Sequence, residues 1–302
     1  MRLLFCADPL DTRSPDPAFH LEVEAARQLG VRFSLFSYET LVNESDAAKA
    51  VRRVDAGDDN EVTVYRGWML RPEHYTHLYE ALIERGVRLI NTPAGYRHCH
   101  YLPESYHLLV GQTPRTVWLP TGEASLDQVM AILEPFGIGP VVVKDYVKSQ
   151  KHRWLEACFI PSAADREGVE RVVSEFVCLQ GADLNEGLVF REFVEFEPVG
   201  VHPSSGMPLT REYRTFILDG EPLLTADYWA EGNYEGEKPS LQTFRELVHR
   251  VKSRFFAMDV AKVKGGGFVI VELGDGQVSG LPNKADPVTF IAALQNGLNP
   301  DR

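Results

Sequence analysis

The sequence has few cysteines and no long apolar run, and these two absences exclude several classes of protein. Its four cysteines, Cys6, Cys99, Cys158 and Cys178, are far apart and form no CxxC pair. This pattern is typical of reduced thiols in a cytosolic protein, whereas a disulfide framework needs denser, paired cysteines. No apolar run approaches the roughly 20 residues that span a membrane, and Leu3–Ala7 is too short for a secretory signal. We therefore expect a cytoplasmic protein with no membrane partner.

The chain also lacks the excess of basic residues that a nucleic-acid surface requires. It has 31 Lys and Arg against 43 Asp and Glu among 302 residues, which gives a formal net charge of −12. Because phosphates demand a basic footprint, we expect no nucleic-acid partner. A small anionic substrate is still compatible with this charge, since a local cluster of Lys and Arg can invert the field within one cleft.

The first third of the chain alternates short apolar segments with amphipathic helices, which predicts a parallel sheet with crossover helices. No GxGxxG follows the first strand-like segment, so a dinucleotide-binding function is unsupported. Arg66 and Asn91 each follow a strand-like segment, at the carboxyl edge where such sheets bind ligands. The strand-like segments are Leu3–Cys6, Val31–Phe36, Val62–Tyr65 and Val87–Ile90.

After Thr113-Pro114 the pattern changes, and the last third is rich in longer strands. The predicted helices of this part are Ser125–Phe136, Ala163–Leu179, Leu241–Arg254 and Pro287–Leu294. The predicted strands include Leu188–Phe196, Tyr213–Leu218 and Leu223–Trp229.

Near the C-terminus, two apolar segments flank a glycine turn, and each segment carries one acid. Phe255–Val260 contains Asp259 and Phe268–Leu273 contains Glu272, with Gly265-Gly266-Gly267 between them. A triple glycine between strand-like segments predicts a hairpin, because glycine takes positive φ without strain. The hairpin places the carboxylates side by side, where magnesium and a nucleotide's phosphates would relieve their repulsion. From these residues alone, a pair of solvent-facing acids is an equally good interpretation.

Val141–Lys144 places a lysine at the end of a buried strand, where its ammonium needs an anion. The next residues, Asp145–Arg153, form the densest basic loop of the chain. Lysines, a hydroxyl and backbone N–H groups in one loop suit a polyphosphate. Taken alone, the loop is better explained as a solvated hairpin. A nucleotidyl-transferring lysine of the KxDG type is not supported, because the residues after Lys144 lack the glycine and place the acid wrongly.

Taken in order, these features resemble the ATP-grasp superfamily of carboxylate–amine ligases. Lys144 and its loop come first, then a hinge strand at Leu188–Glu195, an acid-x-Arg strand at Glu212–Gly220, and the Asp259/Glu272 hairpin. The resemblance spans essentially the whole chain and depends on the order and spacing of the motifs. One uncharacterised clade, named for two arginines and a lysine, has segments similar to Val64–Met69, Ile90–Pro93 and Thr113–Thr116.

The resemblance implies a combined α/β and α+β fold, in which an N-terminal parallel α/β lobe is followed by two α+β lobes that clasp ATP. The implied domains are residues 1–112, an N-terminal Rossmann-like domain; 113–187, the ATP-grasp lid; and 188–302, the C-terminal catalytic subdomain. The implied cofactors are ATP and Mg²⁺.

The resemblance also assigns phosphate-binding and metal-binding roles to individual residues. Lys144 would contact the α-phosphate and the adenine edge, while Lys148, Ser149 and Lys151 would cover the β- and γ-phosphates. Arg214 would neutralise the γ-phosphate and then the acyl phosphate. Asp259 and Glu272 would hold magnesium.

The hinge strand would hold the nucleoside. The backbone of Glu192–Val194 would read adenine, and Glu195 or Glu197 would bind the ribose. The nucleotide-binding residues implied here are Arg191, Glu192, Phe193, Val194, Glu195 and Glu197.

Three departures from the family pattern affect the magnesium site and the lid. The usual Glu-x-Asn is Glu272-Leu273-Gly274 here, so water or Asp275 would fill the third metal position. The phosphate-gripping loop is basic where relatives are often glycine-rich. The lid's usual first lysine is not evident, because His98–Gly111 contains none.

The implied reaction activates a substrate carboxylate as an acyl phosphate, which an amine then captures. Magnesium and arginine would spread the developing charge. Arg66 would hold the carboxylate at the mouth of the cleft, beside the catalytic Arg214 and Lys148; the alternative for Arg66 is a salt bridge between lobes. The substrates would be a small carboxylate and an amine, such as amino acids or peptides. A non-catalytic nucleotide-binding or interaction protein is the alternative function, favoured by the missing Asn.

Overall fold

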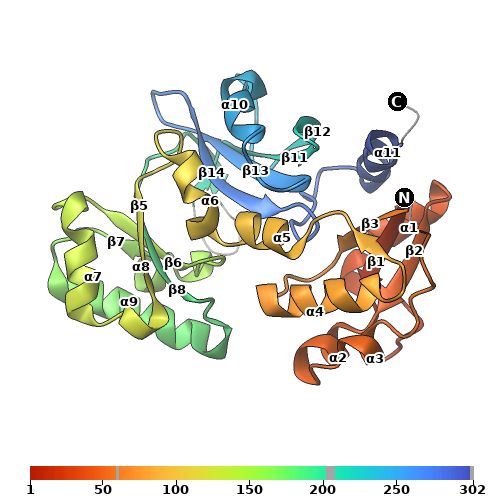
Figure 1. Cartoon of the computed structure of the whole chain (residues 1–302). Helices are drawn as coiled ribbons and strands as arrows, with labels where there is room; N and C mark the ends of the chain where they lie inside the picture. The colour runs from red at the N-terminus through yellow and green to blue at the C-terminus, as the bar shows by residue number, and fades with distance from the viewer. Residues whose placement is uncertain (59–60, 202–207, 300–302) are drawn as a thin grey trace.

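Three four-stranded sheets, one in each of three lobes, organise the computed structural model of the chain (Figure 1). The structure describes residues 1–58, 61–201 and 208–299. The first lobe has a parallel sheet, and the other two have antiparallel sheets with helices. The arrangement confirms the predicted α/β lobe followed by two α+β lobes.

The first lobe is built on the parallel sheet β2-β1-β3-β4, as the alternating pattern predicted. The chain crosses between strands through helices because parallel neighbours cannot be joined by a tight turn. Its strands are β1 (Arg2–Cys6), β2 (Arg32–Phe36), β3 (Val62–Arg66) and β4 (Arg88–Leu89). Its helices are α1 (His20–Gln28), α2 (Tyr38–Asn43), α3 (Ala47–Ala50) and α4 (Pro72–Ile83).

The second lobe has the antiparallel sheet β5-β8-β6-β7, which helices α7 and α9 cover on one face (Figure 1). Its strands are β5 (Thr116–Pro120), β6 (Val141–Asp145), β7 (Phe159–Ile160) and β8 (Gly187–Glu192). Its helices are α7 (Leu126–Leu133), α8 (Trp154–Ala157) and α9 (Arg166–Gln180).

Strand β8 lies on both sides of the predicted boundary at residues 187 and 188. It pairs with β5 and with β6 along its whole length, so it belongs to the sheet of the second lobe. The predicted strand Leu188–Phe196 also ends earlier, at Glu192. On this pairing we propose that the lid extends through Glu192 and that the third lobe begins at Phe193.

The third lobe has the antiparallel sheet β12-β11-β13-β14. The predicted helix Leu241–Arg254 is wrong, because only a 3₁₀ turn at Leu241–Phe244 and helix α10 form there. The residues after α10 lead directly into β13, and Arg254 instead pairs with Asp219 at 2.8 Å. The remaining elements are β9 (Pro198–Val201), β10 (Pro208–Thr210), β11 (Glu212–Leu218), β12 (Glu221–Asp227), α10 (Arg245–Val248), β13 (Phe255–Lys262) and β14 (Phe268–Asp275).

Three helices join the first lobe to the third. Helices α5 (Pro93–His100) and α6 (Leu102–Leu109) pack on β14, and the C-terminal α11 (Pro287–Gly297) packs on α1. One apolar core therefore contains Phe5 of β1 together with Phe216 of β11 and Phe290 of α11. Among the described residues, no helix is long and apolar enough to cross a membrane.

Arg66, at the end of β3, bridges the first and third lobes. Its side chain is 2% exposed, and its Nε and Nη2 donate to the two carboxylate oxygens of Glu22 at 2.8 and 2.9 Å. Its Nη1 donates to the carbonyl oxygens of Gly276 and Ser279 at 2.6 and 2.9 Å. The guanidinium also lies 5.0 Å from the ring centroid of Phe290. The salt bridge is therefore within the first lobe, and the contacts between lobes are hydrogen bonds to carbonyl oxygens, which differs from the salt bridge between lobes given as the alternative for Arg66.

A buried polar network lies next to Arg66. Asn91 Nδ2 donates to Asp275 Oδ2 and to the carbonyl oxygen of Phe255, both at 2.6 Å. The backbone N–H of Gln277 donates to Asp275 Oδ1 at 3.0 Å, and Gln277 Nε2 donates to the Tyr75 hydroxyl at 2.8 Å. Burial raises the pKa of Asp275 to about 7, although the hydrogen bonds from Asn91 and Gln277 act in the opposite direction.

The bridge predicts that Arg66→Ala lowers the free energy of unfolding by about 3–5 kcal/mol, because it leaves the buried Glu22 carboxylate without its partner. Urea unfolding measures the loss, with the exposed Arg88→Ala as the control. A variant that keeps wild-type stability but forms no product would instead support the substrate contact predicted from the sequence.

The raised pKa of Asp275 predicts a stability that depends on pH. Between about pH 4 and 7 the native state holds a proton that the unfolded chain has released, so stability falls as pH rises through this window. Asp275→Asn removes this titration, and its stability relative to wild type should rise between pH 4.5 and 8 by on the order of a few kcal/mol. Urea unfolding at each pH tests this, with the exposed Asp127→Asn as the control. A difference that does not change with pH would contradict the prediction.

Candidate functional site

The glycine turn brings Asp259 and Glu272 together as the sequence predicted. Strands β13 and β14 form an antiparallel hairpin in which the two acids are register partners. Gly265 has φ +70°, a conformation that side chains with a Cβ rarely adopt. Arg214 of β11 is the register partner of Asp259 on the other side. The side chains of Arg214, Asp259 and Glu272 therefore lie in a row across one face of this sheet.

Arg214 and Asp259 form a bidentate ion pair on this face. Arg214 Nε and Nη2 donate to the two Asp259 oxygens at 2.8 and 2.7 Å, and Nη1 donates to the Gly280 carbonyl oxygen at 2.9 Å. The Tyr228 ring lies over the guanidinium, with the Arg214 Cζ 4.9 Å from the ring centroid. The fork is therefore held in one orientation by a carboxylate, a carbonyl and an aromatic face.

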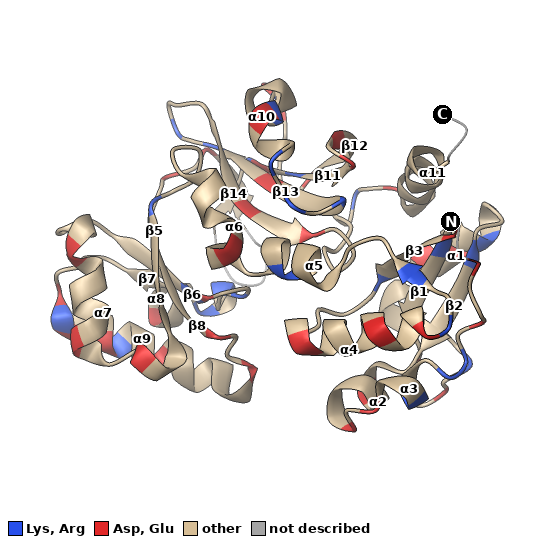
Figure 2. Cartoon of the chain, in the orientation of Figure 1, with Lys and Arg blue, Asp and Glu red and all other residues tan. Residues whose placement is uncertain are grey.

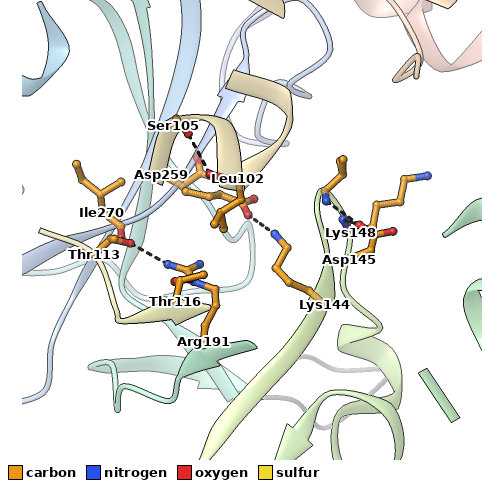
Figure 3. A network of polar contacts seen from close by, with 12 residues as sticks. Leu102, Ser105, Thr113, Thr116, Lys144, Asp145, Lys148, Arg191, Asp259 and Ile270 are labelled. Carbon is orange, nitrogen blue, oxygen red and sulfur yellow. Dashed lines mark hydrogen bonds and ion pairs between the residues drawn. The ribbon is translucent and has the colours of Figure 1, made fainter. Parts of the chain in front are cut away.

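Lys144 reaches the same face from the lid. It lies near the end of β6, and its Nζ donates to Glu272 Oε2 at 2.8 Å. Figure 3 shows Lys144 extending from its strand towards the part of the site that contains Asp259. Burial opposes ionisation of Glu272, but Lys144 and Lys151 outweigh it and lower the pKa of Glu272 to about 2. The anion that the sequence required for Lys144 is therefore Glu272.

These side chains surround a cavity of about 230 Å³ between the lobes. Of the residues predicted from the sequence, the cavity is lined by Lys144, Lys148, Arg214, Asp259, Glu272 and Asp275. His100, Tyr146 and Tyr228 line it as well. Arg66 is not among the lining residues, so we do not propose it as a substrate-binding residue.

A buried acid organises the basic loop after β6. The Asp145 carboxylate accepts from the backbone N–H of Val147 at 2.6 Å and from that of Lys148, and it also accepts from Gln180 Nε2 at 2.7 Å and Asn185 Nδ2 at 3.0 Å. Figure 2 shows basic residues at this end of β6. The loop is therefore fixed at its start by a buried carboxylate, which the solvated hairpin favoured for the loop taken alone did not include.

Farther along this loop, Lys151 contacts the third lobe, and Ser149 is partly buried. The Lys151 ammonium lies 5.7 Å from the ring centroids of both Tyr228 and Trp229. Burial acts to lower the pKa of Lys151, but Tyr228 and nearby carboxylates, Glu212 first among them, outweigh it and raise the pKa. Ser149 and Lys151 do not line the cavity, and their phosphate contacts stay predictions.

The hinge strand lies beside the site rather than in the cavity. Arg191 is buried and donates to Thr113 Oγ1 at 2.8 Å, as Figure 3 shows. The backbone N–H groups of Glu192 and Phe193 already donate to the carbonyl oxygens of Arg115 and Pro140. The backbone N–H groups of two of the three predicted adenine-reading residues are therefore already hydrogen-bonded within the protein.

The remaining hinge residues have partners of their own. Glu195 pairs with Lys264 and Glu197 pairs with Arg211, both at 2.8 Å. Val194 is half-buried. A ribose contact by either acid, and an adenine contact by Val194, stay predictions.

The carboxylates suit magnesium chemically but do not form a three-ligand cluster. In the described part of the chain, no group of three His, Cys, Asp or Glu side chains is placed to hold an ion. Both oxygens of Asp275 accept from Asn91 or Gln277, as both oxygens of Asp259 accept from Arg214, and a metal contact by Asp275 stays a prediction. Asp259 and Glu272 supply hard carboxylate oxygens on adjacent strands, and this donor set fits magnesium.

Sequence reasoning missed Glu212 and His100 near this site. Glu212 is buried two residues before Arg214 on β11, and burial raises its pKa to about 7 against the attraction of Lys151. Its place in the acid-x-Arg strand was the available signal, since residues i and i+2 of a strand share a face. Burial lowers the pKa of His100 to about 3, with Lys148 and Lys144 acting in the same direction. No local pattern marks His100.

The chain is similar to several ATP-grasp structures over nearly its whole length. D-cycloserine synthetase DcsG superposes with a TM-score of 0.61 at 14% identity, covering 99% of this chain and 100% of that chain. The RimK domain ATP-grasp protein from Sphaerobacter thermophilus gives 0.58 at 15% identity, covering 97% and 98%. The ATP-grasp ligase PsnB, in complex with minimal precursor, Mg and ADP, gives 0.56 at 14% identity, covering 98% of each chain. At these identities the likeness shows the fold alone.

Sequence comparison then gives the family. No curated protein matches the chain. Residues 135–294, just over half of the 302 residues, match the family described as ATP-grasp domain, R2K clade family 3. The matched region contains Lys144, Arg214, Asp259 and Glu272. The chain therefore belongs to family 3 of the R2K clade of ATP-grasp domains.

Proposed function

We propose that this protein is an ATP-dependent ligase that joins a carboxylate to an amine through an acyl-phosphate intermediate. The observation that carries the proposal is the row of Arg214, Asp259 and Glu272 on one sheet, facing Lys144 of the lid across a cavity. Positive and hard anionic groups converge there from two lobes. Membership of this family agrees with the predicted cofactors, ATP and Mg²⁺.

Asp259 and Glu272 would hold magnesium, which neutralises phosphate charge when it is bound. Glu272 is well suited, because its low pKa keeps it ionised and its Oε2 alone accepts from Lys144. Asp259 has both oxygens on Arg214, so sharing that carboxylate with an ion would release part of the Arg214 fork. Arg214 would then be available for an anionic oxygen at the same position.

The basic residues around the cavity support phosphate binding. Lys144 and Lys148 approach from the lid, and Arg214 approaches from the third lobe. Fixed cations stabilise charge that develops during phosphoryl transfer without having to reorganise. We assign Lys144 to nucleotide binding, and Lys148 and Arg214 to the transferred phosphoryl group.

The missing Asn keeps the non-catalytic alternative open. A Cβ at Gly274 would lie 2.7 Å from Ser279 Oγ, so a longer side chain does not fit there without movement of Ser279. The alternative predicts a protein that binds ATP without consuming it.

An ADP-release screen tests the proposal. The protein is incubated with ATP, magnesium and panels of carboxylates and amines, including amino acids and dipeptides, and any product is identified by mass spectrometry. Release that needs both substrates, with one amide formed per ADP, supports a ligase. Tight binding of the ATP analogue AMPPNP without release by any pair would favour the non-catalytic alternative.

Lys144→Ala should weaken binding of AMPPNP with magnesium at least roughly tenfold. A charge-assisted phosphate contact contributes about 1.5–3 kcal/mol, and the variant loses it. Calorimetry measures the affinity, with the exposed Lys284→Ala as the control. Unchanged affinity in a folded variant would remove Lys144 from the nucleotide site.

Arg214→Lys should lower kcat at least roughly tenfold while KM for ATP changes much less. Lysine keeps the charge but loses the planar fork that contacts two oxygens at once. The matched control is Arg254→Lys, which alters a similar bidentate pair with Asp219 on the surface. If KM rises and kcat does not change, Arg214 acts in ground-state binding and its assigned role is wrong.

A further inference from the structure

A second cavity adjoins the catalytic one and is formed by the first lobe and the lid. It has a volume of about 120 Å³ and shares Met69, His100, Val147 and Lys148 with the larger cavity. Its other walls come from helices α2 and α4 and from the segment that follows α9. Because the two cavities share a wall, a molecule in the second one lies next to the proposed site of phosphoryl transfer.

The charges around this cavity are of both signs. Arg71 and Lys148 contribute two cations, and Asp183 contributes one anion. Within the described parts of the chain, none of these three side chains takes part in an ion pair. They are therefore available to pair with a charged ligand.

Two imidazoles also line the second cavity. Burial lowers the pKa of His74, and it lowers the pKa of His100 to about 3. Burial therefore opposes a positive charge on both rings, whose nitrogens can form hydrogen bonds. The charged side chains that line the cavity besides these rings are those of Arg71, Lys148 and Asp183.

The wall of the cavity is held in place by buried hydrogen bonds. Asp145 fixes the backbone at Lys148 and accepts from both the backbone N–H and the Nδ2 of Asn185, at 3.1 and 3.0 Å. On the opposite side, the Tyr38 hydroxyl donates to the carbonyl oxygen of Met69 at 3.1 Å. The backbone at Lys148 and the side chain of Asn185 are thus held in place before any ligand binds.

The cavity is too small for a peptide. Drug-sized ligands occupy pockets of roughly 300–1,000 Å³, whereas this cavity has about 120 Å³. Arg71 Nη2 also donates to the carbonyl oxygen of Ala182 at 2.5 Å and so joins the first lobe to the lid. A peptide ligand would have to break this contact or extend out of the cavity.

We propose that the second cavity binds a small free amino acid as the substrate of the adjoining site, an inference that rests on the proposed ligase function. The carboxylate pairs with Arg71 and Lys148, and the ammonium pairs with Asp183. Because Lys148 lines both cavities, the carboxylate lies at the junction with the catalytic one. The site selects a single zwitterion and rejects peptides.

Calorimetry on the full chain tests the ligand class. The protein is first titrated with AMPPNP and magnesium, and the saturated complex is then titrated with glycine, L-alanine, D-alanine and L-serine. The corresponding methyl esters, N-acetyl derivatives and tripeptides are the comparison set. At least one free amino acid should bind, and removing either of its charges should weaken binding at least tenfold.

Two variants test the location. Asp183→Asn and Arg71→Gln should each raise the dissociation constant for the amino acid at least tenfold while the affinity for AMPPNP changes by less than about twofold. The exposed Asp127→Asn and Arg88→Gln are the matched controls and should change neither.

The outcomes separate this inference from the proposed function. If wild-type protein does not bind AMPPNP, the proposed function fails first. If AMPPNP binds but tripeptides bind better than free amino acids, or if Asp183→Asn and Arg71→Gln bind amino acids as wild type does, the inference about the second cavity is overturned. The ligase assignment would then remain.

Discussion

The buried guanidinium of Arg66 is the interaction on which the arrangement of the lobes depends. Its three nitrogens donate to the carboxylate of Glu22 in the first lobe and to backbone carbonyls after β14 in the third. A buried charge is tolerated only when it is fully paired. Separating the two lobes would leave Arg66 Nη1 without its carbonyl partners after β14, while the ion pair with Glu22 lies within the first lobe.

Strand β14 connects the contacts between the first and third lobes to the candidate site. Asp275, at its end, is held by Asn91 of the first lobe, and Glu272, three residues earlier, pairs with Lys144 of the lid. The position of Glu272 is thus set from one side by the interlobe network and contacted from the other by the lid. A substitution at Asn91 or Arg66 would act on the site through this strand, without touching a substrate.

Local signals predicted the parts of the site that are close in sequence. The triple glycine predicted the hairpin that brings Asp259 near Glu272, but their direct pairing also depends on a register shift between Asp259 and Val260, without which Asp259 would oppose Val271. Contacts between distant segments had no such signal: Arg66 and Gly276 are 210 residues apart, and nothing near Arg66 shows that it is buried. The pairing of β8 also had no local signal, because its partners, β5 and β6, are not its neighbours in sequence, and the boundary that we propose after Glu192 depends on that pairing.

The absence of Asn at position 274 is a feature of the local packing rather than an isolated loss. Ser279 Oγ donates to the carbonyl oxygen of Asp275 at 2.8 Å and occupies the space that a side chain at Gly274 would need. The turn that positions Ser279 also directs its carbonyl oxygen to Arg66. Residue 274 and the interlobe bridge are therefore coupled through one turn, so restoring Asn there would disturb Ser279 and, with it, a contact of Arg66. Magnesium keeps water ligands readily, so under the proposed function two carboxylates with water would be the donor set, without a side chain at position 274.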